Sequence, residues 1–166
     1  GGLSDLAKES VTNISAVVKK LTGKDIQDYD LHVQFPGTHN VDGDSASITM
    51  ATAIISAFEG VPIDQNLAMT GSLSVRGEVL PIGGVSAKIE AAVKSGIERV
   101  IIPRSNLQDV LIDEKYEAMV EVLPVDSLDE VLQHALVGAE EKVTLVERLA
   151  NVIDTISSGA DTQPSA

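Results

Sequence analysis

Apolar side chains recur at helical spacing near the beginning of the chain, at Leu6, Val11, Ile14, Val17, Val18 and Leu21. A period of about 3.6 residues predicts an amphipathic helix over residues 4–21. Residues 29–35 then alternate between apolar and polar side chains, which is typical of a strand. Over residues 44–60 the side chains are apolar or small on nearly every side, and this pattern predicts a buried helix.

The rest of the chain alternates between short strand patterns and helical patterns. Strands are predicted over residues 67–75, 78–80, 99–103 and 120–123, with the first two forming a hairpin. Helices are predicted over residues 85–95, 107–111, 128–136 and 140–156, and a disordered polar tail over residues 157–166. This alternation predicts one compact α/β (α+β) domain over residues 1–156, packed around the buried helix that starts near Asp44. Within the domain we expect an N-terminal helix and linker (1–27), a core (28–136) and a C-terminal helix (138–156).

Charge and composition exclude several classes of partner and site. The 166 residues include 12 basic and 25 acidic side chains, a net charge of -13, which opposes binding to nucleic acid or to anionic lipid surfaces. No cysteine is present, so thiol nucleophiles, disulfides and thiolate metal sites are excluded. No apolar run approaches the roughly 20 residues of a membrane helix. We therefore expect a soluble fragment without direct membrane contact.

Ser45 is a candidate nucleophile because it follows an acidic turn, Asp42-Gly43-Asp44, at the predicted start of the buried helix. The first turn of a helix has unpaired backbone N–H groups and positive partial charge, so it can stabilise an oxyanion. The alternative interpretation is that Asp44 or Ser45 is only an N-cap.

A serine nucleophile also needs a base. Three histidines are available, His32, His39 and His134, but no G-x-S-x-G motif supports a Ser-His-Asp arrangement. Lys88 is a second candidate because it lies three residues after Val85, at the edge of the apolar stripe of its predicted helix. Burial lowers the pKa of a lysine, and a neutral amine is a general base. The alternative is that the stem of Lys88 lies along the apolar edge while its charge reaches water or pairs with a carboxylate.

Other side chains support the lysine hypothesis. Thr70 is placed to orient the amine by a hydrogen bond, although a β-branched residue is also common in a strand. The Gly83-Gly84 pair allows another part of the backbone to come close to the site. Asp42 and Asp44 hold the lysine protonated if either contacts it directly, or they only cap the helix.

Three segments resemble, in order, the proteolytic domain of Lon proteases. They are DGDSAS at residues 42–47, MTGSLSVRGEVLPIGGVSAKIEAA at residues 69–92 and GIERVIIP at residues 96–103. The resemblance extends over about residues 29–134 and implies that Ser45 and Lys88 form a catalytic dyad, with Thr70 beside the lysine and Asp42 three residues before the serine. The serine motif here is GDSAS, which differs from the GPSAG of the bacterial form and is similar to the archaeal, membrane-anchored branch.

The resemblance also implies a function for a longer protein. It implies a serine endopeptidase that degrades unfolded or misfolded proteins as a homo-hexamer, with this domain in the cytoplasm and a parent chain that is membrane-anchored. No G-x-x-x-x-G-K-[ST] motif occurs, so ATP and Mg²⁺ are expected only in an ATPase module outside this chain, and no cofactor or metal is expected here. Two other classes stay open, namely a non-catalytic Lon-like scaffold or peptide-binding module, and a hydrolase of small esters that depends on His32 or His39.

Overall fold

A three-stranded parallel sheet forms the centre of the molecule. The computed structural model describes residues 5–34, 44–138 and 140–158. The strands of the sheet lie in the order β1 (Leu67–Met69), β4 (Arg99–Pro103) and β5 (Glu121–Val125). In the middle strand, Val100 pairs with Ala68 on one side and with Val122 on the other. Parallel strands are covered on both faces and therefore read as apolar runs, so β4 could be predicted with its observed bounds.

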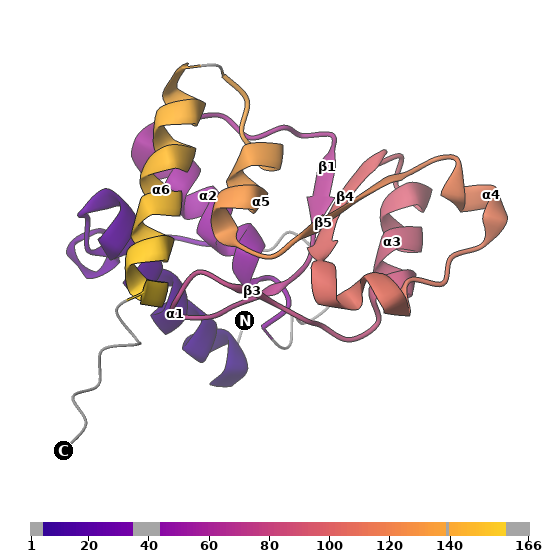
Figure 1. Ribbon diagram of the computed structural model, residues 1–166, viewed down its shortest axis with the longest axis horizontal. Coiled ribbons are helices and arrows are strands. Elements are labelled where there is room, and N and C mark those ends of the chain that lie inside the picture. Colours follow the sequence, from indigo (N-terminus) through magenta and orange to yellow (C-terminus); the bar gives the residue numbers. More distant parts are fainter. Residues whose placement is uncertain (1–4, 35–43, 139, 159–166) are drawn as a thin grey trace.

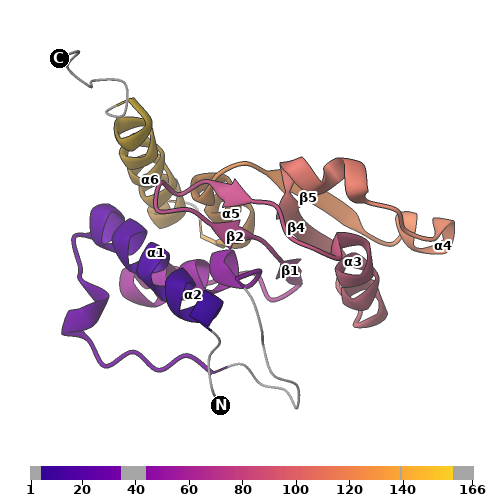
Figure 2. The same ribbon diagram turned by 90° about the horizontal axis from the view of Figure 1, so that it is seen from below.

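Helices cover the two faces of this sheet unequally (Figures 1 and 2). The helix α3 (Val85–Lys94) lies on one side, where its buried residues pack with Val100 and Ile102 of β4. On the other side lie α1 (Asp5–Thr22), α2 (Ser47–Glu59), α5 (Leu128–Ala135) and α6 (Glu140–Ser158). Ile101 of β4 belongs to the apolar cluster of this second, larger layer. The mixture of helices and strands in one domain is the α/β (α+β) class that the sequence predicted.

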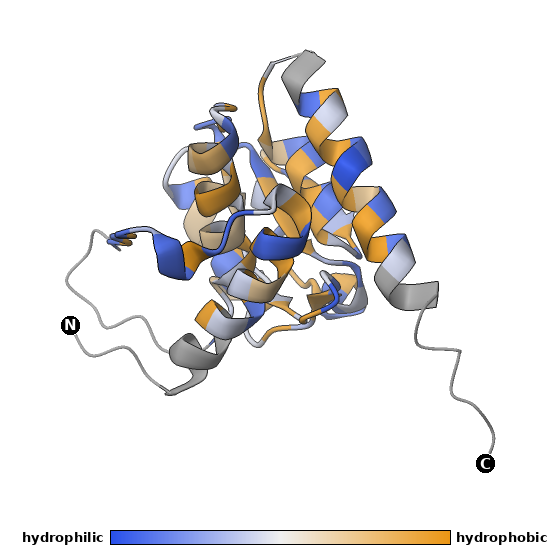
Figure 3. Cartoon of the chain, turned by 90° about the vertical axis from the view of Figure 1, so that its left-hand side faces the viewer, coloured by the Kyte–Doolittle hydropathy of each residue, from blue (hydrophilic) through white to orange (hydrophobic). Residues whose placement is uncertain are grey.

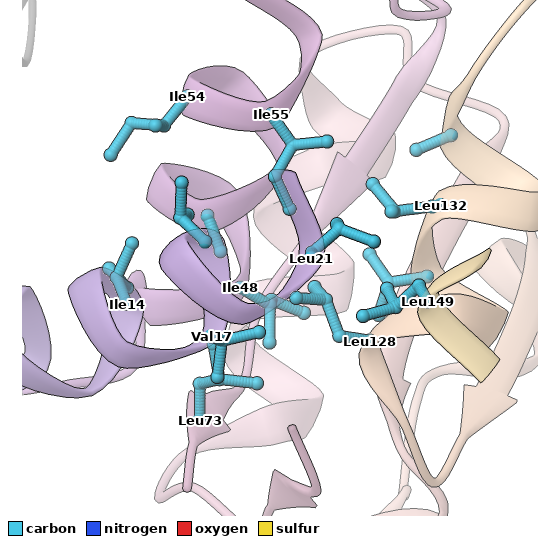
Figure 4. Close-up of a cluster of buried hydrophobic side chains, with 14 of the residues drawn as sticks. Ile14, Val17, Leu21, Ile48, Ile54, Ile55, Leu73, Leu128, Leu132 and Leu149 are labelled. Carbon is cyan, nitrogen blue, oxygen red and sulfur yellow. The ribbon is translucent and has the colours of Figure 1, made fainter. Parts of the chain in front are cut away.

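The larger core is built around α2. Ile48, Ala51 and Ile55 are fully buried, and side chains from α1, α5 and α6 close over them (Figure 4). The chain has no Trp and only two Phe, so this core consists of aliphatic side chains, each of which contributes about 1.5–3 kcal/mol when it is fully buried. Figure 3 shows apolar and polar residues alternating along α6, the pattern of a helix that buries one face.

The strand predicted over residues 67–75 is divided in two. Its first part, β1, belongs to the parallel sheet, whereas β2 (Ser72–Leu73) pairs with β3 (Val79–Leu80) in an antiparallel hairpin. The predicted hairpin is thus present, and Gly77 in its turn has a φ of 88°, a value that glycine adopts without strain. The break falls at Thr70 and Gly71, where the chain turns away from β4. A local alternation pattern cannot reveal such a change of partner, because both halves remain extended.

The prediction of a strand over residues 29–35 is wrong for residues 29–34. This segment pairs with no strand among the described residues and is exposed along its length. Its alternating apolar side chains, Tyr29, Leu31 and Val33, are 48%, 37% and 49% exposed. The apolar and polar side chains do alternate, but a strand also requires a neighbouring strand to satisfy its backbone N–H and C=O groups. Phe35 lies outside the described residues.

Several short elements also differ from the prediction. In place of a helix over residues 107–111 there is a 3₁₀-helix, η2 (Arg104–Asp109). Two unpredicted turns, η1 (Ile26–Asp28) and α4 (Glu114–Glu117), are each capped by an aspartate that accepts a backbone N–H. The helix α6 continues to Ser158, so the predicted disordered tail begins at least two residues too early; residues 159–166 lie outside the described part.

Candidate active site

The turn that carries Ser45 precedes α2. The helix begins at Ser47, three residues later than Asp44, and its N-cap position is occupied by Ala46, which makes no side-chain cap bond. The interpretation of Ser45 or Asp44 as a side-chain N-cap is therefore wrong. Instead, the carbonyl oxygen of Asp44 accepts hydrogen bonds from the backbone N–H, at 2.9 Å, and the hydroxyl of Ser47. Ser45 lies half-buried in the turn, so its side chain is not enclosed in the core.

The first helical amides are already occupied. The Ser47 N–H donates to the Asp44 carbonyl at 2.9 Å, and the Ile48 N–H donates to the Gly71 carbonyl at 3.3 Å. An oxyanion held at the helix start cannot use these two donors without breaking existing bonds, which corrects the simple expectation from the helix dipole. The amides of the turn itself, at Ser45 and Ala46, are the nearer candidates for that role.

The segment between β1 and β2 holds this turn from the side. The backbone N–H of Gly71 donates to the carbonyl oxygen of Ser45 at 2.8 Å, and the Thr70 hydroxyl donates to the same oxygen at 3.2 Å. The Ser72 hydroxyl donates to a carboxylate oxygen of Asp44 at 2.5 Å. Thr70 and Ser72 are buried, at 7% and 6% exposure, so these polar contacts attach the half-buried turn to a buried segment.

Lys88 reaches the same segment from α3. Its helix buries the stripe of Val85, Ile89 and Val93, and Lys88 lies half-buried beside that stripe. The lysine Nζ donates to the Thr70 Oγ1 at 3.3 Å. Burial lowers the pKa of Lys88 from its ordinary value of 10.5, and the charge of Asp44 acts in the opposite direction with a smaller effect. The neutral form of the Lys88 amine is therefore more favoured at this site than it is for a lysine in water.

The structure thus gathers four of the predicted site residues: Ser45, Asp44, Thr70 and Lys88. Thr70 connects Ser45 and Lys88, since its hydroxyl donates to the Ser45 carbonyl and accepts from the Lys88 amine. The Asp44 carboxylate is bound by Ser72. No sequence signal pointed to Ser72, because a serine in an alternating strand is usually assigned to the polar, solvent-facing side.

The glycine pair before α3 includes the N-cap residue of that helix. Gly84 is the N-cap of α3 and has a φ of 69°, which strains any residue with a side chain. No described atom lies within 4 Å of the Cβ position at either Gly83 or Gly84. The conformation of Gly84 therefore accounts for this glycine, whereas the predicted close approach of another backbone segment to the pair has no counterpart among the described atoms and stays a prediction.

The other candidates are not placed beside Ser45 by the described residues. Asp42, Gly43 and His39 lie outside the described residues. In the described part, neither His32, in the exposed segment before residue 35, nor His134, on α5, forms a hydrogen bond with Ser45. No group of three or more His, Asp or Glu side chains suited to a metal ion occurs among the residues that the structure describes. Likewise, none of the described helices combines the length and hydropathy needed to span a bilayer.

Comparison with known proteins assigns the family. Residues 1–138 match the family described as "Lon protease (S16) C-terminal proteolytic domain". The chain is 53% identical over 159 residues to the Archaeal Lon protease of Methanothermobacter thermautotrophicus, an alignment that covers 95% of this chain and 24% of that protein. It is 50% identical over 166 residues to the Archaeal Lon protease of Pyrococcus abyssi, covering 98% of this chain and 17% of that protein.

A more distant relative is the Lon protease of Azorhizobium caulinodans, which is 36% identical over 156 residues that make up 89% of this chain and 18% of that protein. The higher identity to the archaeal proteins agrees with the resemblance carried by the GDSAS motif. The chain spans about a quarter or less of the length of these curated relatives. Taken with the match over residues 1–138, this similarity shows that the chain belongs to the Lon protease C-terminal proteolytic domain family, a family of serine-type peptidases.

Proposed function

We propose that the chain cleaves peptide bonds with Ser45 as nucleophile and Lys88 as general base. The observation that carries the proposal is the Thr70 hydroxyl, which donates to the Ser45 carbonyl at 3.2 Å and accepts from the Lys88 Nζ at 3.3 Å. A single side chain thus ties the turn of the nucleophile to the amine of the base. The lowered pKa of Lys88 supports the same assignment, because a base must lose its own proton before it can accept another.

In the proposed reaction, the neutral Lys88 amine takes the proton of the Ser45 hydroxyl as the oxygen attacks a substrate carbonyl. Amides of the turn at Ser45 and Ala46 stabilise the negative oxygen that develops. The lysine ammonium then protonates the leaving amine, and an acyl-enzyme remains. The restored amine next takes a proton from water as the water oxygen attacks the acyl group, and the lysine ammonium returns that proton to the Ser45 oxygen when the bond between this oxygen and the acyl carbon breaks. Serine, lysine and water supply every atom and proton, so the reaction requires no metal or organic cofactor in this domain.

We further propose that the domain works as part of a longer ATP-dependent protease. The relatives are about four times the length of the aligned region or longer, which leaves room for an ATPase module that unfolds substrates and delivers them. We propose unfolded or misfolded proteins as substrates, a homo-hexamer as the assembly and the cytoplasm as the location. The net charge of -13 speaks against nucleic acid as a partner of this domain.

Two substitutions test the dyad with matched controls. Ser45→Ala and Lys88→Gln are each expected to abolish cleavage of a fluorogenic peptide and of an unstructured protein, while the far-UV circular dichroism is unchanged. The matched controls, Lys94→Gln and Ser95→Ala, lie at the exposed C-terminal end of α3, the helix that carries Lys88, and should retain activity. A fluorophosphonate should label the parent chain at Ser45 alone. The rate of cleavage should rise with pH through a midpoint below 10.5, since burial lowers the pKa of Lys88.

The outcome also separates the proposal from its rivals. Full activity of Ser45→Ala or of Lys88→Gln contradicts the dyad. Peptide binding without any cleavage or labelling by the parent chain supports a non-catalytic scaffold or peptide-binding module. Loss of activity in His32→Ala, with full activity in Lys88→Gln, supports a histidine-dependent hydrolase.

A further inference from the structure

Asn106 is a buried polar residue outside the site described above. It lies in η2, directly after β4, and is only 4% exposed. Its side-chain oxygen accepts the backbone N–H of Ile82 at 2.8 Å, and its side-chain nitrogen donates to the backbone carbonyl of Ile82 at 3.0 Å. The same nitrogen also donates to a carboxylate oxygen of Asp109 at 3.0 Å, which orients the amide. One side chain thus holds both backbone groups of a residue 24 positions away.

The residue that Asn106 holds lies in the loop before α3. This loop contains Gly83 and Gly84, and the N-cap Gly84 has no side chain to cap the helix. No described atom packs against the Cβ positions of these two glycines. Glycines have more backbone freedom to lose than any other residue, so the loop does not by itself define where the helix starts. An external contact must supply that definition.

Ser86, in the first turn of α3, makes a second contact with the segment that follows β4 and contains Asn106. The Ser86 hydroxyl donates to the carbonyl of Asp109 at 3.0 Å and accepts the backbone N–H of Leu111 at 2.9 Å. The apolar stripe of α3 also packs against β4 and holds the helix on the sheet. The hydrogen bonds are directional, so they add a specific constraint on the axial position of α3 at its first turn.

The position of Lys88 follows from the position of this helix start. The backbone N–H of Lys88 donates to the carbonyl of Gly84 at 3.2 Å, so the lysine is one helical turn from the loop. Its Nζ is 3.3 Å from the Thr70 Oγ1, close to the upper limit for a hydrogen bond. A shift of the helix start moves the Cα of Lys88 with it, so the amine keeps this contact only if the side chain adopts a different conformation.

We infer that Asn106 is a positioning residue for the proposed reaction, which acts by clamping Ile82 and thereby fixing the place of Lys88 relative to Thr70 and Ser45. The inference rests on the proposed function. Asn106 touches neither substrate nor the reacting atoms in this arrangement. Its effect is transmitted through the loop at residues 81–84 and the first turn of α3.

The test compares Asn106→Asp and Asn106→Ala with the parent chain. The aspartate keeps the shape of the side chain but cannot donate to the Ile82 carbonyl, and it brings a second carboxylate next to Asp109. We expect kcat for a fluorogenic peptide to fall about 10- to 100-fold in both variants, with KM within about 3-fold, because misplacement by about 1 Å can reduce the rate by about that factor. Labelling of Ser45 by a fluorophosphonate should slow in the same proportion. The exposed Asn66→Ala is the matched control and should keep the parent kcat.

A second readout does not depend on activity. The pH titration of the ¹³Cε signal of Lys88, assigned with Lys88→Gln, reports the pKa of this amine directly. In Asn106→Asp the titration is expected to move toward that of an ordinary lysine, because a displaced helix start admits water to the amine. A structural role without positioning changes thermal stability but leaves the Lys88 titration and the kcat of the folded fraction at their parent values.

Two results overturn the inference. In the first, Asn106→Asp folds and has a kcat within about 2-fold of the parent value. In the second, the Lys88 titration is unchanged and the loss of activity only matches the loss of folded protein. Failure of the proposed function has a different signature, since Ser45→Ala and Lys88→Gln then cleave as well as the parent chain. If those two variants are inactive and the Asn106 variants are fully active, only the positioning role is lost. If Asn106→Ala does not fold, the isosteric Asn106→Asp decides.

Discussion

Thr70→Val removes the hydroxyl that connects Ser45 and Lys88 while it keeps the shape of the side chain. Two hydrogen bonds disappear, one of 3.2 Å to the Ser45 carbonyl and one of 3.3 Å from the Lys88 Nζ. The Ser45 carbonyl keeps its 2.8 Å bond from the Gly71 N–H, so no buried acceptor is left without a partner. Because both lost bonds are long, each should contribute at the lower end of the usual range, giving a loss of stability of about 1–2 kcal/mol in total.

The effect on catalysis should be larger than the effect on folding. Without the Thr70 oxygen, the Lys88 amine is no longer held toward the turn of Ser45, and we expect kcat to fall about 10- to 100-fold, which corresponds to about 1.4–2.7 kcal/mol. The assay is cleavage of a fluorogenic peptide, with kcat and KM determined separately. Thermal unfolding should show a decrease in Tm of only about 2–8 °C, since about 2–4 °C corresponds to 1 kcal/mol for a domain of this size.

Thr70→Ser is the matched control, because it keeps the hydroxyl and removes only a methyl group. It should lose a similar amount of stability and keep kcat within about 3-fold of the parent value. The reasoning is refuted if Thr70→Val retains kcat within about 2-fold, or if Thr70→Ser loses as much kcat as Thr70→Val. In either case the hydroxyl does not orient the amine.

Three further substitutions test the site and its support. Lys88→Met should abolish cleavage yet unfold at the same or a higher temperature than the parent chain at pH 7. Burial lowers the pKa of the Lys88 amine in the folded chain, so the unfolded chain binds more protons and the stability of the parent rises with pH toward 10.5. The difference in Tm between Lys88→Met and the parent should therefore become smaller as the pH rises. Gly71→Ala should lower the free energy of unfolding by about 1–3 kcal/mol, because its Cβ meets a methyl of Val79 at 3.0 Å. Leu149→Ala, at a fully buried position of α6, should cost about 2–5 kcal/mol, whereas the exposed Val143→Ala should change stability by less than about 0.5 kcal/mol.

Each of these expectations has a contrary result. A large fall in the Tm of Lys88→Met at pH 7 means that the charged lysine stabilises the fold and is not penalised by burial. An unchanged unfolding midpoint in urea for Gly71→Ala means that the strand segment moves to accept a side chain. Equal effects of Leu149→Ala and Val143→Ala mean that α6 is not docked on the core in solution.

Sequence periodicity was sufficient to predict the elements whose burial follows from the pattern of their own residues. The helices α1, α3, α5 and α6 each bury one face, and β4 is covered on both faces, so their patterns carry the information locally. The residue types of the candidate site were equally visible, since a serine beside a glycine-containing turn and a lysine at the edge of an apolar stripe are local features. Their expected roles depended on the resemblance of three short motifs to one family.

Other features depend on contacts between distant segments and could not be read locally. The segment over residues 29–34 has the alternation of a strand but no strand partner in the part of the chain that the structure describes, and the run over residues 67–75 changes partner at Thr70. Likewise, the Ile48 amide at the start of α2 is occupied by the carbonyl of Gly71, which lies 23 residues away along the chain.

The amino-acid sequence by itself determined which residues of this protein are apolar, which are able to react, and where helices with one buried face occur. The tertiary structure decided which of the reactive groups meet. Thr70 lies 25 residues from Ser45 and 18 from Lys88, and the clamp at Asn106 acts across 24 residues. Hydrogen bonds depend on distance and direction between atoms, and for groups so far apart along the chain these are set only when the core closes.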